Sequence, residues 1–106
     1  MSILEIRGYQ LRPGVRDTFD RVFRERIRPV SDGYGIDVVR AGPSLDDADG
    51  YVLIRAFASL EARARQKDAF YGGPEWLGGL EDEVMAMIAS YHTTVIEVDR
   101  TEDLRG

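Results

Sequence analysis

The segment IDVVRAGPSLDDADGYVLIRAF, residues 36–57, decides the fold because it places two strands in succession with no helix between them. IDVVRA (36–41) and YVLIRAF (51–57) are short and rich in β-branched residues, as is typical of strands. The polar stretch GPSLDDADG (42–50) between them has the length and composition of a hairpin loop. We therefore expect two neighbouring antiparallel strands in the middle of the chain.

Upstream of this hairpin, the sequence predicts one strand and one helix. ILEIRGYQL (3–11) comes close to alternating apolar and polar residues, which indicates a strand. The turn residues Pro13 and Gly14 follow, and an apolar stripe at spacings of three and four then predicts a helix over 15–30. We expect Pro29 and the DGYG stretch that follows to end this helix.

Downstream of the hairpin, the sequence predicts a broken helix and a last strand. Ser59 is a good N-cap for a helix over 60–72, and Gly72-Gly73 interrupts that helix. Pro74 can begin a third helix at its first position. The apolar stripe of this helix comprises Leu77, Leu80, Val84, Met87, Ile88 and Tyr91. TTVIEV (93–98) is β-branched and predicts the fourth strand.

The resulting order, βαββαβ, predicts an α+β, ferredoxin-like domain over residues 1–98, with a polar tail over 99–106. In this arrangement a four-stranded antiparallel sheet carries its helices on one face. The other face is left bare although the strands supply apolar residues to it, and a monomer rarely exposes so much apolar area. We therefore expect a homodimer that buries this face, sheet against sheet.

Composition excludes several classes of function. The net charge of −5 argues against a nucleic-acid partner, although thirteen of the fourteen basic residues are arginine. The absence of cysteine removes disulfides and thiolate chemistry. The first residues do not form a signal peptide and no apolar run is long enough for a membrane span, so we expect no membrane partner and a cytoplasmic protein.

No metal site or cofactor is expected from the sequence. The acidic hairpin loop fails as an EF-hand, because with Asp47 and Asp49 in register Leu45 and Ala56 occupy the first and last ligand positions. One histidine without cysteine makes a transition-metal site improbable. Nucleotide-binding glycine loops and serine-hydrolase elbows are also missing from the sequence.

Two stretches resemble NIPSNAP-family domains. EIRGYQLRPG (5–14) resembles the strand and turn that begin such domains, and AFASLEARARQKDAFYGGPEW (56–76) resembles their second half. The resemblance spans Ile3 to about Val98 and implies a dimeric α/β barrel. Relatives in that superfamily include cofactor-free monooxygenases, isomerases and haem-degrading enzymes. This chain lacks the asparagine that haem-degrading relatives use, which argues against haem breakdown.

FYGGPEW (70–76) supplies the first candidate site residues. The resemblance implies a cleft between sheet and helices with this linker at its mouth. Tyr71 and Trp76 would then line an apolar pocket, and the glycines would allow a lid to move. The alternative is that Phe70 and Trp76 only fill the end of the core where the helix breaks.

Arginines on the strands are candidates for binding a negatively charged ligand. Arg7 and Tyr9 share one face of the first strand, and Arg55 interrupts an apolar third strand. A charge inside a sheet requires a partner, because burying it unpaired costs several kcal/mol. Glu5, Glu97 or the second protomer can supply that partner. The other interpretation is that Arg7 or Arg55 receives the carboxylate or enolate of a substrate.

His92, the only histidine, is the candidate catalytic residue because its ordinary pKa lies near neutrality. A helix cap or an interface residue is the alternative. Together these residues suggest a small-molecule-binding protein, with a cofactor-free enzyme of monooxygenase or isomerase type acting on an aromatic or polyketide-like substrate as the leading hypothesis. A non-catalytic dimer that binds a metabolite or a partner in the same cleft is the competing one.

Overall fold

The structure is a computed structural model that describes residues 2–99. Apart from residue 99, the expected polar tail lies outside the described residues. The elements follow one another as β1 (Ser2–Leu11), α1 (Arg16–Val22), the π-helical turn η1 (Phe23–Ile27), α2 (Arg28–Gly33), β2 (Asp37–Pro43), β3 (Gly50–Phe57), α3 (Leu60–Tyr71), the π-helical turn η2 (Trp76–Leu80), α4 (Glu81–Met85) and β4 (Ile88–Val98).

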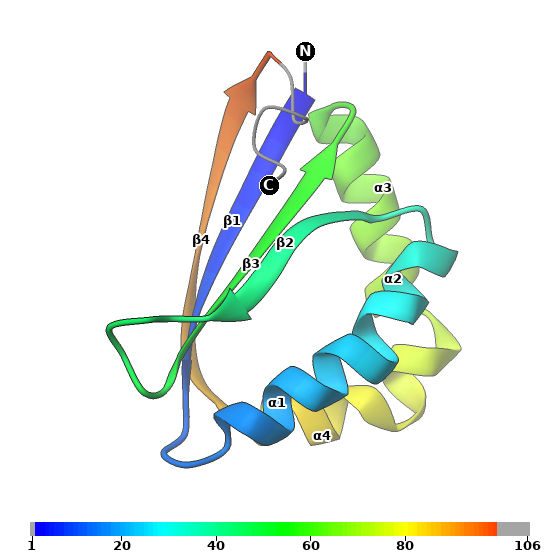
Figure 1. The fold of residues 1–106 in the computed structure, drawn as a ribbon. Helices are drawn as coiled ribbons and strands as arrows, with labels where there is room; N and C mark the ends of the chain where they lie inside the picture. Colours follow the sequence, from blue (N-terminus) through cyan, green and yellow to red (C-terminus); the bar gives the residue numbers. More distant parts are fainter. Residues whose placement is uncertain (1, 100–106) are drawn as a thin grey trace.

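The four strands form one antiparallel sheet in the order β2-β3-β1-β4, and the helices all lie on one face of it (Figure 1). The predicted ferredoxin-like α+β fold is thereby confirmed. Because β1 is central, it pairs along nearly its whole length with β3 on one side and β4 on the other. Glu5 contacts Arg63 and Lys67 of α3, so the side chains at odd-numbered positions of β1 face the helices. Among residues 2–99 no helix is long and apolar enough to cross a membrane.

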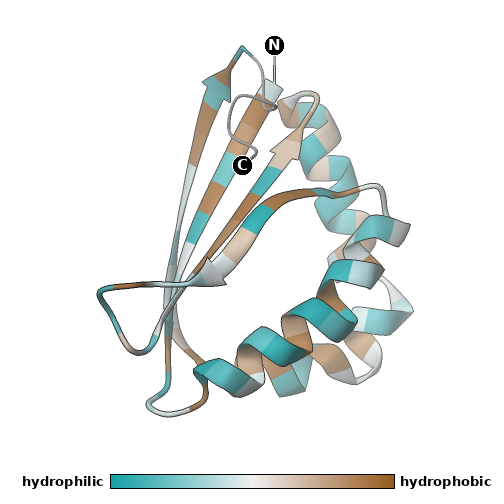
Figure 2. Cartoon of the chain, in the orientation of Figure 1, coloured by the Kyte–Doolittle hydropathy of each residue, from teal (hydrophilic) through white to brown (hydrophobic). Residues whose placement is uncertain are grey.

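The core lies between the sheet and the helices. Phe19 is almost completely buried, and its ring contacts Tyr51 edge-on, with ring centroids 4.9 Å apart. Phe70 fills another part of the core, where its ring contacts the rings of Tyr34 and Trp76. Figure 2 shows that the segments forming this core are not equally apolar: α3 is mostly hydrophilic.

The first helical segment ends within the DGYG stretch, as the sequence predicted, but it runs through Pro29 instead of stopping there. Pro29 lies in the first turn of α2, directly after η1, where the absence of a backbone N–H is tolerated. The last helical residue is Gly33, the second residue of DGYG, and Gly35 then reverses the chain with φ of +74°. The backbone N–H of Ile36 donates to the carbonyl of Ser31 (3.0 Å) and so caps the helix end.

The last helix is shorter, and the last strand longer, than the sequence predicted. α4 ends at Met85 and β4 begins at Ile88, so Ile88 and Tyr91 belong to a strand rather than to the helical stripe. Pairing with β1 satisfies the backbone groups that a helix would otherwise bond internally. A register shift opposite Gln10 and Leu11 inserts an extra residue in β4, which brings Ile88 and Tyr91, three apart, to the same face.

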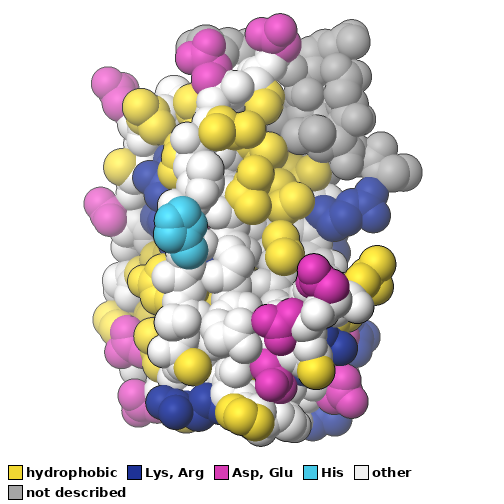
Figure 3. All heavy atoms as spheres, turned by 90° about the vertical axis from the view of Figure 1, so that its left-hand side faces the viewer, with side chains coloured by type: hydrophobic (Ala, Val, Ile, Leu, Met, Phe, Trp, Pro, Cys, Tyr) yellow, Lys and Arg dark blue, Asp and Glu magenta, His cyan; other side chains and the backbone are white. Residues whose placement is uncertain are grey.

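The helix-free face of the sheet carries what we call the outer apolar patch: Ile6, Val52, Ile54, Ile96 and Val98. Cross-strand pairs place these residues on the face opposite the helices. Val52 and Ile96 are 36% and 43% exposed, and the rest are half-buried. Figure 3 shows apolar side chains gathered on this face beside the single histidine. None of the helices within residues 2–99 covers this patch (Figure 1).

Candidate functional site

An open cleft of about 440 Å³ lies on the helical side of the sheet, between β1 and β4 on one wall and α3, η2 and α4 on the other. Its size falls in the range of small-molecule sites. The cleft is lined by four aromatic, three apolar and three charged residues: Tyr9, Tyr71, Trp76, Tyr91, Val84, Met85, Ile88, Arg7, Lys67 and Glu81.

Aromatic rings form two walls of the cleft. Tyr71 and Trp76 meet almost at right angles, with ring centroids 5.1 Å apart. On the strand side, the rings of Tyr9 and Tyr91, direct cross-strand partners, lie 6.1 Å apart. The indole Nε1–H of Trp76 donates to the carboxylate of Glu81 (3.1 Å), which fixes the ring. Both aromatic pairs line the same cleft.

The interruption between α3 and η2, within FYGGPEW, places Tyr71 and Trp76 on the same cleft. α3 ends at Tyr71, and η2 begins at Trp76 after a turn that packs closely against Tyr34. A Cβ on Gly73 would lie 2.2 Å from the Tyr34 hydroxyl, so a larger residue here would force Tyr34 or the turn to shift. That hydroxyl donates to Glu75 (2.7 Å), which ties the turn to the end of α2.

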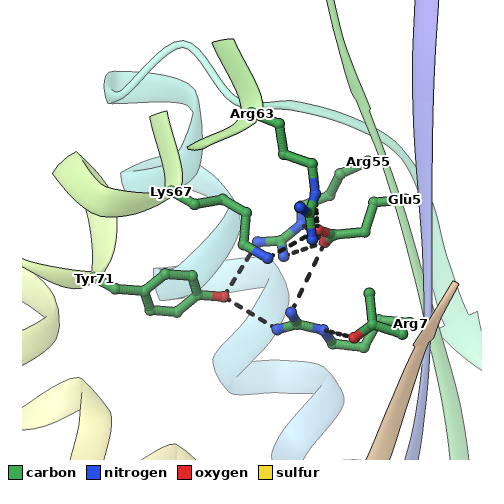
Figure 4. A network of polar contacts seen from close by, with 7 residues as sticks. Glu5, Arg7, Arg55, Arg63, Lys67 and Tyr71 are labelled. Carbon is green, nitrogen blue, oxygen red and sulfur yellow. Dashed lines mark hydrogen bonds and ion pairs between the residues drawn. The ribbon is translucent and has the colours of Figure 1, made fainter. Parts of the chain in front are cut away.

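At the inner end of the cleft, a completely buried carboxylate is surrounded by cations (Figure 4). Arg55 donates to Glu5 Oε1 through Nε (2.8 Å) and also through Nη2. Arg63 and Lys67, one turn apart on α3, each donate to Oε2 at 2.8 Å. Burial raises the pKa of Glu5, but Arg55 and Lys67 more than offset it and lower the pKa to about 2.

Arg7 completes the cluster without pairing closely with the carboxylate. Its Nη2 lies 4.0 Å from Glu5 Oε1, while its Nε donates to the Thr93 hydroxyl (3.1 Å). Its guanidinium carbon lies 4.9 Å from the centre of the Tyr91 ring, a cation–π contact. Among the described residues four cations thus share one carboxylate, and the cluster carries three positive charges in excess.

The phenol of Tyr71 lies between the cation cluster and the cleft. Its oxygen accepts a hydrogen bond from Arg7 Nη1 (3.3 Å) and another from Arg55 Nη1 (3.2 Å), as Figure 4 shows. Arg7 and Lys67 reach the cleft surface, whereas Arg55 lies behind them, 3% exposed. Burial lowers the pKa of Lys67, and its hydrogen bond to Glu5 opposes that shift.

The structure brings together five of the six site residues predicted from the sequence. Arg7, Tyr9, Tyr71 and Trp76 line the cleft, and Arg55 lies directly behind Tyr71. Of the partners considered for Arg55, Glu5 is the one it contacts.

The sixth predicted residue, His92, is not among them. It pairs with Gly8 across β1 and β4, which puts it on the face opposite the helices, and it is exposed there (Figure 3). It therefore cannot reach a ligand in the cleft of its own protomer.

Sequence reasoning missed Arg63, Lys67 and Tyr91 as parts of this site. Arg63, Lys67 and Tyr71 recur every four residues, so they share one helix face. Glu5, Arg7 and Tyr9 likewise recur every two residues on one strand face. These two polar stripes were the available signal. Among residues 2–99, no three or more histidine, aspartate or glutamate side chains come together in a way that could hold a metal ion.

Solved structures with the same fold come from several bacteria. An uncharacterised NIPSNAP-like domain protein from Burkholderia xenovorans shares 18% identity, with a TM-score of 0.84 over 92% of this chain and 85% of that one. A NIPSNAP family protein of unknown function from Agrobacterium tumefaciens shares 23%, also with a TM-score of 0.84, over 93% and 89% of the two chains. A proposed antibiotic biosynthesis monooxygenase from Nitrosomonas europaea shares 16%, with a TM-score of 0.71 over 92% and 89%.

At these identities the likeness concerns the fold alone. No protein of curated function matches the sequence significantly. The family model for NIPSNAP, in contrast, matches residues 4–98, almost the whole of the described chain. This protein therefore belongs to the NIPSNAP family.

Proposed function

We propose that this protein binds a small aromatic ligand carrying one negative charge, such as a carboxylate or an enolate. The ring would lie between the Tyr71–Trp76 pair and the Tyr9–Tyr91 pair, and the anionic group would lie at Arg7 and Lys67. The observation that supports this most strongly is the charge imbalance at the inner end of the cleft, where four cations share one carboxylate.

Arg7, Arg63 and Lys67 are 11–24% exposed, and an excess of positive charge on partly buried groups favours the binding of an anion. Glu5 already accepts from Arg55, Arg63 and Lys67, so an additional anion must come from elsewhere. Arg7 is the natural recipient. It faces the cleft, and it donates to the neutral oxygens of Thr93 (3.1 Å) and Tyr71 (3.3 Å), whereas its Nη2 lies 4.0 Å from the Glu5 carboxylate. Guanidinium groups bind carboxylates in two-point contacts, which also orient the ligand.

The outer apolar patch supports a second part of the proposal, that two copies associate through their sheets. Such a dimer would cover the exposed Val52 and Ile96 and would place His92 near the interface. Each cleft opens on the opposite, helical side of its sheet. The dimer would therefore leave both clefts accessible to ligand.

Ligand binding is tested by titrating the protein with benzoate and, as its neutral counterpart, benzamide. We expect saturable binding of benzoate in calorimetry, accompanied by a change in the fluorescence of Trp76, the only tryptophan. Benzamide should bind at least tenfold more weakly, because it offers no charge to the cations.

Two variants make this test specific. Arg7→Met should abolish the preference for benzoate, whereas Arg24→Gln, which removes an exposed guanidinium paired with Asp20, should retain it. Equal affinity for benzoate and benzamide in the unmodified protein would contradict an anion site.

A further inference from the structure

Tyr71 has a hydrogen-bonding arrangement that an ordinary buried phenol lacks. Its oxygen accepts two hydrogen bonds from charged guanidinium groups, one from β1 and one from β3. A phenol oxygen has two acceptor positions, so both are occupied. Among residues 2–99 nothing accepts the phenol's own hydrogen. Because Tyr71 lines the cleft, that hydrogen is available to a ligand there.

The groups that face this phenol come from every neighbouring element, and on balance they favour a negative charge on it because the cations outnumber the carboxylates. β1 contributes Arg7, Tyr9 and Glu5, β3 contributes Arg55, and α3 contributes Lys67 and Arg63. On the far walls of the cleft lie the neutral Tyr91 from β4 and the carboxylate Glu81, held by Trp76. The excess positive charge of the cluster lies next to the phenol. The negative charge of an ionised Tyr71 would therefore balance one of the three excess positive charges.

Two phenols beside the same cleft are shifted in opposite directions. Burial raises the pKa of Tyr9. Burial also raises the pKa of Tyr71, but the charges of Arg55 and Arg7, together with their hydrogen bonds, outweigh it and lower that pKa below its usual value. Environments that separate the pKa values of neighbouring groups are the usual way in which a protein assigns acid and base roles.

We propose that Tyr71 is the proton-transferring residue of this cleft, and that its phenolate removes the proton from the acidic hydroxyl of a bound phenol or enol. In this step the O–H bond of the ligand breaks and an O–H bond forms on Tyr71. The electron pair of the broken bond stays on the ligand oxygen, which becomes the anion held by Arg7 and Lys67. The total charge of the complex is unchanged.

This proposal rests on the proposed function, because the cleft must first accept an aromatic ligand. It narrows the ligand from aromatic anions in general to aromatics that bind as neutral acids and ionise in the site. It also assigns to Tyr71 the acid–base role that the sequence alone suggested for His92.

The first test needs no ligand. An ultraviolet titration follows the ionisation of the five tyrosines, whose ordinary pKa is about 10. We expect one of the five to ionise at a lower pH than the rest. That component should be missing in Tyr71→Phe and present in Tyr34→Phe, the matched control, whose hydroxyl donates to Glu75 instead. Persistence of the low component in Tyr71→Phe, or its absence from the unmodified protein, would overturn the proposal.

The second test compares benzoate, which arrives as an anion, with 4-methylphenol, which arrives neutral. As the pH rises through the Tyr71 transition, we expect benzoate affinity to fall by up to tenfold per pH unit, since the phenolate competes with it for the cations. The affinity of 4-methylphenol should rise over the same range, because the phenolate can take its proton. In Tyr71→Phe both dependences should disappear.

The outcomes separate the two proposals. If neither probe binds at any pH, the proposed function fails and the role of Tyr71 fails with it. If benzoate binds and the affinity of 4-methylphenol does not rise through the transition, the anion site stands and proton transfer by Tyr71 is overturned. A Tyr71→Phe protein that retained the opposite pH dependences would likewise overturn it. Urea unfolding of each variant verifies that it is folded.

Discussion

Glu5 and Arg55 are direct cross-strand partners on β1 and β3, and their side chains are 0% and 3% exposed. The guanidinium Nε lies 2.8 Å from Oε1 of the carboxylate. This pair of strand residues also positions Tyr71 in the candidate site. It gives Arg55 the partner that a buried charge requires, and it holds the Arg55 Nη1 at 3.2 Å from the Tyr71 oxygen.

Removing the Glu5 charge should destabilise the protein strongly. In Glu5→Gln, four cations would remain around a neutral amide, and leaving buried charges unpaired typically costs about 3–5 kcal/mol. Urea unfolding measures the loss. The matched control is Glu83→Gln, which breaks the half-exposed pair with Arg26 and should cost less than about 1 kcal/mol. Similar losses in the two variants would contradict the arrangement around Glu5.

Glu5 should also make stability depend on pH in the acid range. Its pKa falls from an ordinary 4.5 to about 2 on folding. Between these values the unfolded chain binds more protons than the folded one, so the free energy of unfolding decreases as the pH falls through this window. The stabilisation is fully present above pH 4.5 and amounts to about 3 kcal/mol at most.

Unfolding experiments across this pH range test the effect. Glu5→Gln should lack this part of the acid dependence, because it has no carboxyl group to titrate at that position. If Glu5→Gln retained the full acid dependence of the unmodified protein, other carboxyl groups would be its source.

Much of the fold followed from the sequence because strand and helix periodicities are local signals. The alternation in β1 and the β-branched run of β3 placed both strands within one residue of their observed limits. The Ser59 cap was also correct, since its hydroxyl accepts from the backbone of Ala62 (3.0 Å). The start of β4 was missed because a bulge gave Ile88 and Tyr91 the spacing of a helix.

The site was predicted less completely because it depends on which face of each element is buried. His92 has suitable chemistry, but its position in the β4 register directs it away from the helices. α3 offered no apolar stripe, since its inward face carries Arg63 and Lys67. A polar stripe on a helix ordinarily indicates a solvated face. Only the sheet opposite, with Glu5 at its centre, shows that this stripe is partly buried.

Two glycines near the cleft should respond in opposite ways to substitution by alanine. In Gly73→Ala the new Cβ would lie 2.2 Å from the Tyr34 hydroxyl and 3.0 Å from the Ala69 carbonyl. We expect a loss of about 1–3 kcal/mol in unfolding free energy, as for other overpacked positions. Gly78 has open space around its Cβ position, so Gly78→Ala should be neutral or gain up to about 1 kcal/mol. A Gly73→Ala protein as stable as the unmodified one would show that the turn before Trp76 can relax away from Tyr34.

The proposed dimer predicts that one charge on the outer apolar patch separates the protomers. Ile96 is 43% exposed on the helix-free face, on the edge strand β4, where it pairs with Leu4 of β1. In a sheet-to-sheet dimer, Ile96→Glu would bury a carboxylate against the partner's apolar residues, which costs several kcal/mol without a compensating cation. Sedimentation equilibrium should therefore show a dimer for the unmodified protein and a monomer for Ile96→Glu.

Leu45→Glu is the control for this experiment. Leu45 is fully exposed in the hairpin loop between β2 and β3, away from the patch, so the variant should remain dimeric. If Leu45→Glu but not Ile96→Glu dissociated the dimer, the result would indicate that the interface lies at the hairpin loop. An unmodified protein that sedimented as a monomer at micromolar concentration would contradict the sheet-to-sheet dimer. It would leave the binding proposal intact, because every residue lining the cleft belongs to one chain.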